Sequence, residues 1–223
     1  MGRTFLIQYN GPIFLHPPKT AGTSIINALV QSKIAIVDNS VDFNKFLVYD
    51  LHQTFREFEY PADADYAISV RSPYTRYVSL YYQYCWYEKK KYLADPKDSD
   101  KTLMKFKRYL INTLYRGDRG SFPCTHWING ITGKINIIKF ENLISDVKNI
   151  YNIDLRSFPK SDRKGLNTNY TNTVTEQETI KSILEFYDDA VISIINDIAQ
   201  SDFTTFGYTK FNNYQEMVDY AQN

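Results

Sequence analysis

The fold of this chain is decided by one stretch near its N-terminus, Ile13-Phe14-Leu15-His16-Pro17-Pro18-Lys19-Thr20-Ala21-Gly22-Thr23-Ser24-Ile25-Ile26-Asn27-Ala28-Leu29. It begins with a short apolar run suited to a buried strand, and two prolines end that run. Apolar side chains then return at helical spacing, at Ile25, Ile26, Leu29 and Val30. The pattern predicts a strand, a turn and a helix.

The predicted turn contains the residue types of an anion site. Unpaired backbone N–H groups converge at a helix N-terminus, and the helix dipole favours negative charge there. Gly22 allows a ligand close to the backbone, and Lys19 adds a full positive charge. The residues expected to hold a phosphate or sulfate group are Lys19, Thr20, Ala21, Gly22, Thr23 and Ser24, through amides and hydroxyls. The order differs from a nucleotide-binding Walker loop, because here the lysine precedes the glycine.

These residues resemble the 5′-phosphosulfate loop of sulfotransferases, in the His-x-Pro-Lys-Thr-x-Gly-Thr-Ser form of the carbohydrate sulfotransferase branch. The segment from Val70 to Tyr81 is similar to the family's second signature, which binds the 3′-phosphate of the donor. The resemblance assigns Arg71 and Ser79 to that phosphate. It leaves open whether Arg76 is a further contact or a surface residue.

Other parts of the chain resemble the same family. A late basic pair, Arg163 and Lys164, corresponds to the family's segment that closes over the 3′-phosphate end of the donor. The remaining matches are Phe122–Ile128, where Thr125 replaces a usual glutamine, Phe140–Leu143 and Asp202–Tyr208. The resemblance implies 3′-phosphoadenosine 5′-phosphosulfate as co-substrate, a hydroxyl acceptor, and no metal.

The expected fold class is α/β, with a single P-loop-like domain over residues 1–223 and a mostly parallel sheet flanked by helices. A second strand at Ile34–Val37 would complete a βαβ unit with the first strand and helix. Buried strands are also expected at Tyr66–Val70 and Ile135–Phe140. Expected helices are Pro73–Tyr87 after the cap Ser72, 102–116, one through Tyr187 after the capping box at Thr175, and 191–199.

An acceptor hydroxyl needs a base, and three histidines are available in the sequence. The resemblance favours His52 as that base, because similar enzymes place a histidine between the first βαβ unit and the 3′-phosphate strand. Glu57 and Glu59 are alternatives in the same irregular region. His16 and His126 are interpreted as structural.

Composition limits the other possibilities. A net charge of +1 argues against general nucleic-acid binding, and no apolar run reaches the length of a membrane span. No signal peptide is expected, and two cysteines without a framework point to a reducing, cytoplasmic setting. The acceptor, expected to be a glycan or small molecule, and the oligomeric state stay open. A nucleotide kinase-like phosphotransferase and a catalytically idle nucleotide- or glycan-binding module are the alternative functions.

Overall fold

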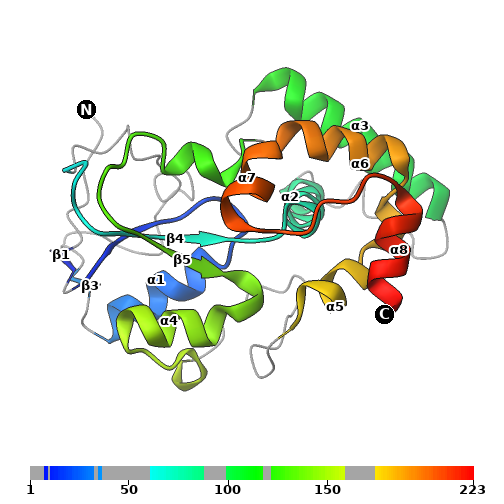
Figure 1. Cartoon of the computed structure of the whole chain (residues 1–223). Helices are drawn as coiled ribbons and strands as arrows, with labels where there is room; N and C mark the ends of the chain where they lie inside the picture. The colour runs from blue at the N-terminus through cyan, green and yellow to red at the C-terminus, as the bar shows by residue number, and fades with distance from the viewer. Residues whose placement is uncertain are drawn as a thin grey trace. The chain divides into compact units, whose positions relative to one another are not determined.

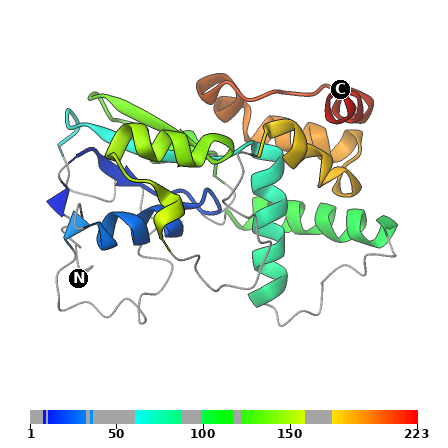
Figure 2. The same cartoon turned by 90° about the horizontal axis from the view of Figure 1, so that it is seen from below.

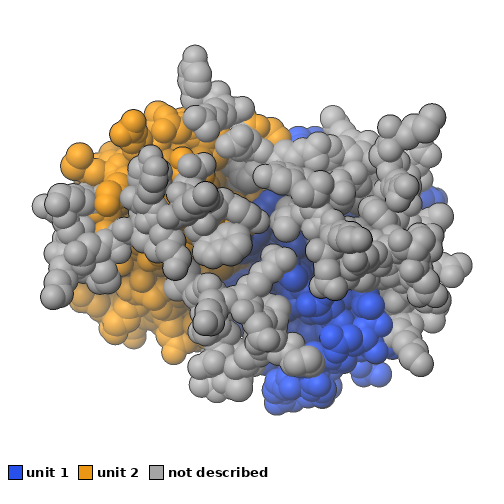
Figure 3. All heavy atoms as spheres, turned by 180° about the vertical axis from the view of Figure 1, so that it is seen from behind, with its two compact units in different colours: residues 1–70, 126–173 blue, residues 71–125, 174–223 orange. Residues whose placement is uncertain are grey.

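The computed structural model describes residues 8–9, 11–32, 35–36, 61–87, 99–117, 122–158 and 174–223. They form two compact units, which Figure 3 distinguishes by colour. Unit 1 is drawn from residues 1–70 and 126–173, and unit 2 from residues 71–125 and 174–223. The expected single domain over residues 1–223 stays a prediction.

A three-stranded parallel sheet forms the centre of unit 1. Its strands are β2 (Ile13–Leu15), β4 (Tyr66–Val70) and β5 (Ile135–Lys139), in the order β2-β4-β5. The expected strands and their parallel arrangement are therefore confirmed. In the register Leu15 lies opposite Ile68, so the segment after β2 emerges beside the end of β4.

The partner expected for the first strand is wrong. The strand β3 (Ala35–Ile36) pairs antiparallel with β1 (Gln8–Tyr9) in a separate two-stranded sheet. The parallel neighbour of β2 is instead β4, so the connection through the first helix leads to a strand much later in the chain. Strand propensity identified the apolar segment around Ala35, but pairing depends on non-local contacts that propensity does not encode.

Two helices cover one face of the parallel sheet. The helices α1 (Gly22–Gln31) and α4 (Leu143–Tyr151) lie on the same side of it (Figure 1). Their apolar stripes meet one sheet face in a common core: Phe14, Ile25, Ile26, Ala28, Leu29, Ala67, Ile138, Leu143, Val147, Tyr151, Ile153 and Leu155. Short 3-10 turns, η6 (Phe140–Asn142) and η7 (Leu155–Ser157), flank α4. The core supports the segment that joins β2 to α1.

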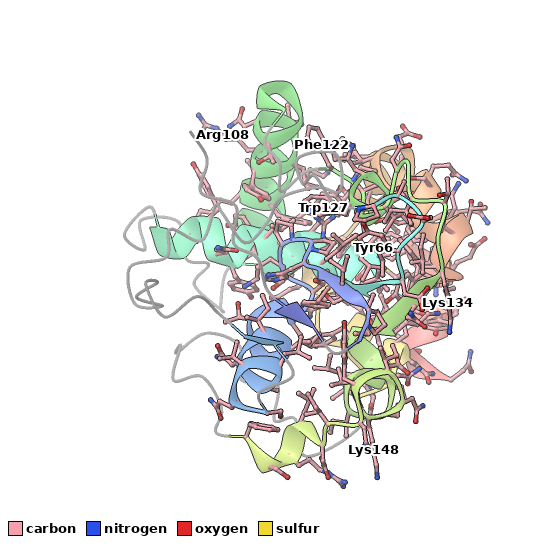
Figure 4. All side chains as sticks on the ribbon, turned by 90° about the vertical axis from the view of Figure 1, so that its left-hand side faces the viewer. Tyr66, Arg108, Phe122, Trp127, Lys134 and Lys148 are labelled. Atoms are coloured by element: carbon pink, nitrogen blue, oxygen red, sulfur yellow. The ribbon has the colours of Figure 1, made fainter. Side chains whose placement is uncertain are left out.

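The surface and interior of unit 1 follow the polarity of the side chains. Tyr66 and Trp127 are fully buried, whereas Lys134 and Lys148 extend outward (Figure 4). Buried Tyr66 donates its hydroxyl hydrogen bond to the carbonyl of Pro61 at 2.8 Å. The large aromatic ring is thus accommodated without an unpaired hydroxyl.

Unit 2 is helical, with α2 (Pro73–Tyr87) at its centre and α3 (Ser99–Arg116) lying across it (Figure 2). The other elements are α5 (Glu176–Lys181), η8 (Leu184–Phe186), α6 (Asp189–Ile198), α7 (Gln200–Phe206) and α8 (Tyr214–Gln222). A further 3-10 turn, η5 (Cys124–Trp127), spans the passage of the chain from unit 2 to unit 1. Aromatic side chains dominate the interior, where Tyr81, Phe106 and Phe186 meet edge to face.

Sequence patterns located most of these helices. Both expected ends of α2 are confirmed, as is the capping box at Thr175 and Glu178. The helix α3 begins three residues earlier than expected, and α5 ends at Lys181 instead of reaching Tyr187. After α5 the chain tightens into 3-10 geometry, where the amide of Ile183 donates to the carbonyl of Ile180 at 3.1 Å.

Candidate active site

The turn between β2 and α1 has an unusual backbone. Lys19 and Ala21 both adopt positive φ, at 68° and 69°. A left-handed conformation costs an L-residue about 1–2 kcal/mol. Strain of this kind persists where the surrounding structure imposes it, and it is concentrated at functional sites. Turns that mix left- and right-handed residues also form concavities of N–H groups that bind anions.

The N-terminus of α1 lacks the side-chain hydrogen bond that an N-cap residue commonly provides. Ala21 occupies the N-cap position and provides no side-chain hydrogen bond to the first turn. Within the described part of the chain, the amides of Ser24 and Ile25 return to the carbonyl of Ala21, at 3.0 and 3.3 Å. The amides that precede them are the donors that an anion receives at a helix start. The side chains of Lys19, Thr23 and Ser24 are half-buried around this turn.

Glycine is required at position 22 because the ring of His16 occupies the space of a side chain there. A Cβ atom added there would lie 1.8 Å from Cδ2 of His16 and 2.2 Å from its Cγ. The His16 ring is buried and stacks on Phe14, with ring centroids 6.3 Å apart. This packing is that of a structural histidine, as the sequence interpretation proposed. Gly22 therefore makes room for His16 as well as allowing a ligand near the backbone.

Thr20 ties the loop to the sheet. Its fully buried hydroxyl donates to the carbonyl of Pro17 at 2.7 Å and lies 2.6 Å from Oγ of Ser69. Because a hydroxyl has one proton, Ser69 must be the donor to Thr20. The expected contribution of the Thr20 hydroxyl to anion binding is corrected, since only its backbone amide can serve. Sequence reasoning missed Ser69, whose signal was a single polar residue inside a buried strand.

In unit 2, one residue assigned to the 3′-phosphate, Arg71, lies just before α2, and the other, Ser79, lies within it. Arg71 follows the last residue of β4, and its Nε donates to Oγ1 of Thr75 at 2.9 Å. Ser79 is four residues further along the helix and is nearly buried. Residues four apart on a helix share a face, so Thr75 and Ser79 form one stripe of α2, and the Nε hydrogen bond brings Arg71, which precedes the helix, to that stripe. Thr75 was not identified from the sequence.

Arg76 is neither a surface residue nor placed on that stripe. Its side chain is fully buried, and Nη1 donates to the carbonyl of Phe122 at 3.0 Å. Its guanidinium also lies over the ring of Tyr77, 5.6 Å from the centroid. The surface alternative for Arg76 is therefore wrong, because the side chain holds the segment that contains Phe122 against α2.

A buried carboxylate completes this cluster. Asp202 on α7 accepts hydrogen bonds from the amides of Cys124 and Thr125, at 2.7 and 2.9 Å. Burial raises the pKa of the Asp202 carboxyl, while nearby Arg76 and the two amides oppose that rise. Burial also raises the pKa of the Cys124 thiol, whose sulfur accepts the backbone N–H of Arg71. The segments around residues 71, 124 and 202, far apart in sequence, thus share one polar interior.

Several expected site residues cannot be placed. His52, Glu57, Glu59, Arg163 and Lys164 lie outside the described residues. His126 is exposed at the end of η5, with its ring at the edge of Trp127. Among the residues that the structure describes, no cluster of His, Cys, Asp and Glu could hold a metal ion. None of the described helices is both long enough and apolar enough to span a membrane.

Comparison with known proteins assigns a family to this arrangement. A model of the sulfotransferase family matches residues 9–209, which include the strained loop, α2 and the buried cluster around Asp202. No curated protein and no solved structure matches the chain.

Proposed function

Because this chain belongs to the sulfotransferase family, we propose that it transfers the sulfuryl group of 3′-phosphoadenosine 5′-phosphosulfate to a hydroxyl group, preferably on a carbohydrate. The observation that carries the proposal is the turn before α1. There, Lys19 and Ala21 are left-handed, and Ala21, at the N-cap position, makes no side-chain hydrogen bond to the helix start. Such a turn suits the 5′-phosphate of this donor.

The reaction would be an in-line displacement at sulfur. A bond forms between the acceptor oxygen and sulfur while the bond from sulfur to the 5′-phosphate oxygen breaks. The leaving phosphate gains negative charge, which Lys19 and the amides from Thr20 to Ser24 would stabilise. The acceptor proton passes to a base, for which we propose His52.

Recognition of the 3′-phosphate would use the second set of residues. Arg71 presents a planar fork of donors that matches a phosphate, and Ser79 adds a hydroxyl on the same helix face. Arg163 and Lys164 would add positive charge at this end of the donor. In this proposal Lys19 binds the 5′ end of the nucleotide, and Arg71 binds the 3′-phosphate of the same molecule.

The choice of acceptor rests on the carbohydrate form of the loop sequence from His16 to Ser24. A kinase-like phosphotransferase is disfavoured because its Gly-Lys-Ser/Thr order is missing. An idle binding module would be expected to lose Lys19 or Arg71, and both are present. A cytoplasmic location stays a prediction.

The decisive experiment measures transfer of labelled sulfate from the donor to a panel of glycans, lipid head groups and phenols. Sulfation of a glycan supports the proposal, and preference for another class would correct the acceptor. Absence of transfer to every class, with nucleotide binding retained, would favour the idle module. A thermal-shift comparison of adenosine 3′,5′-bisphosphate with ATP and magnesium separates the kinase alternative, which predicts stabilisation by ATP.

A further inference from the structure

The hydrogen bond between Arg71 and Thr75 has a defined direction. Thr75 Oγ1 lies 3.1 Å from the carbonyl of Ser72, to which it donates. Its single proton is used in that bond, so the same oxygen can only accept from Nε of Arg71, at 2.9 Å. The Ser72 carbonyl thus orients the Thr75 hydroxyl, and the hydroxyl in turn orients the guanidinium plane.

The surroundings make this orientation persistent. Thr75 is almost completely buried and Ser72 is fully buried, so water does not compete for the hydroxyl. The bond involves a charged donor, which strengthens it relative to a bond between neutral groups. An arginine side chain has many rotamers, and one fixed nitrogen removes much of that freedom before a ligand arrives.

The position of Thr75 also relates it to both residues assigned to the 3′-phosphate. Thr75 and Ser79 are four apart on one face of α2, and Arg71, just before the helix, reaches that face through its hydrogen bond to Thr75. Arg71 uses Nε for Thr75, and Nε lies on one edge of the planar guanidinium. The bond to Thr75 therefore fixes one edge of the guanidinium and restricts the direction of the others, and Thr75 does not need to touch the ligand itself.

We propose that Thr75 is a positioning residue that holds the Arg71 guanidinium ready for the 3′-phosphate and so sets the selectivity for nucleotides that carry this group. The inference rests on the proposed function, because it takes the donor and the role of Arg71 from it.

The test compares two nucleotides that differ only in the 3′-phosphate. Calorimetry measures the Kd of adenosine 3′,5′-bisphosphate and of adenosine 5′-phosphate for the wild type, Thr75→Val and Thr75→Ser. Valine keeps the β-branched shape and removes the hydroxyl, whereas serine keeps the hydroxyl. We expect Thr75→Val to weaken bisphosphate binding by about tenfold, to leave 5′-phosphate binding unchanged, and Thr75→Ser to restore the wild-type preference.

A matched control is present in α5. Buried Thr179 also donates to the carbonyl three residues before it, at Glu176, but the structure gives it no hydrogen bond to an arginine. Thr179→Val should leave both nucleotide affinities unchanged. A second check is Arg71→Lys, which lacks Nε; in that background Thr75→Val should have no further effect on bisphosphate binding.

The outcomes distinguish a failure of the positioning role of Thr75 from a failure of the proposed 3′-phosphate site. Equal weakening of both nucleotides by Thr75→Val, or no weakening of the bisphosphate, would overturn the positioning role and leave the proposed function standing. A wild-type protein that does not prefer the bisphosphate would overturn the 3′-phosphate site itself, and the positioning role with it. If Thr75→Val does not fold, an unaltered preference for the bisphosphate in Arg71→Lys would refute the inference, because the Nε that Thr75 holds would then be dispensable.

Discussion

The two strand-to-helix junctions of this protein are stabilised in different ways. Before α1, in unit 1, the chain adopts two left-handed residues and leaves the helix start without a side-chain cap. Before α2, in unit 2, side chains make the hydrogen bonds: Arg71 donates to the Thr75 hydroxyl, Thr75 donates to the carbonyl of Ser72, and Arg76 donates to the carbonyl of Phe122. The first junction keeps backbone donors available at a cost in strain, whereas the second uses buried polar contacts to hold its arginine. Removal of the cation at the first junction should therefore affect catalysis most, whereas removal of the buried carboxylate behind the second should affect stability most.

The largest effect is expected at the first junction, on turnover. Lys19→Ala should lower kcat/KM for sulfate transfer by at least about 10²–10³-fold, because the charge on the leaving phosphate loses its cation. The unfolding temperature should change little, since the side chain is half-buried in a loop. Lys134→Ala, at an exposed lysine of the same unit, is the control and should retain full activity. Wild-type turnover in Lys19→Ala would remove this residue from the mechanism.

At the second junction, the largest effect is expected on the free energy of unfolding. Asp202→Ala removes the acceptor of two buried amides and an acidic neighbour of buried Arg76. We expect the free energy of unfolding to fall by about 3–5 kcal/mol, as when one partner of a buried charge pair is removed. Urea denaturation measures the loss. Asp197→Ala, at an exposed position of α6, should change stability by less than about 0.5 kcal/mol. Similar losses in the two variants would contradict the importance of the cluster.

A clash introduced at the start of α1 tests the packing of His16. Gly22→Ala should destabilise the protein by about 1–3 kcal/mol, because the new methyl group overlaps the buried His16 ring. Combining it with His16→Ala should recover part of that loss, which a double-mutant cycle measures.

The control for backbone strain alone is Gly117→Ala, where φ is +62° and an added Cβ would meet nothing within 4 Å. It should give a smaller loss, of about 1 kcal/mol, that His16→Ala does not alter. If the stability losses of Gly22→Ala and His16→Ala simply add, the new methyl group does not overlap the His16 ring in the folded variant.

The smallest expected effect is a gain in stability, from the substitution Ala21→Gly. Ala21→Gly relieves the cost of a positive φ at the N-cap position of α1, and the gain is partly offset by the greater freedom of glycine in the unfolded chain. Stability should rise by about 0.5 kcal/mol in thermal or urea unfolding. Ala28→Gly, inside the same helix, should instead destabilise by about 1 kcal/mol. A loss of stability in Ala21→Gly would mean that the left-handed turn carries no strain.

Local signals predicted much of this structure. Ser72 and Pro73 predicted the start of α2, and Thr175 and Glu178 predicted the capping box. The two apolar runs on either side of Gly22 predicted the loop between β2 and α1. Each of these features depends on residues within a few positions of one another. For such features the required conformation is a property of the backbone and the nearest side chains.

Contacts between distant segments were not predictable in this way. Three features depend on residues that are separated by many positions in the sequence. They are the pairing of β3 with β1, the burial of Arg76 and the hydrogen bond from Ser69 to Thr20. The sequence around Arg76 is compatible with both a surface and an interior position, because a charged side chain is buried only where distant groups accept its hydrogen bonds. Here the carbonyl of Phe122 accepts such a bond, and Asp202 is an acidic group whose negative charge acts on Arg76.

The amino-acid sequence alone determined the family signatures, the strand–turn–helix stretch and the residue types available for binding two phosphates. Only the tertiary structure decided that the Thr20 hydroxyl is used internally, that His16 requires Gly22, and that Thr75 accepts a hydrogen bond from Arg71. The physical reason is that helix starts and turns are governed by short-range sterics and hydrogen bonds. The use of each polar group depends on which distant neighbours burial brings within hydrogen-bonding distance.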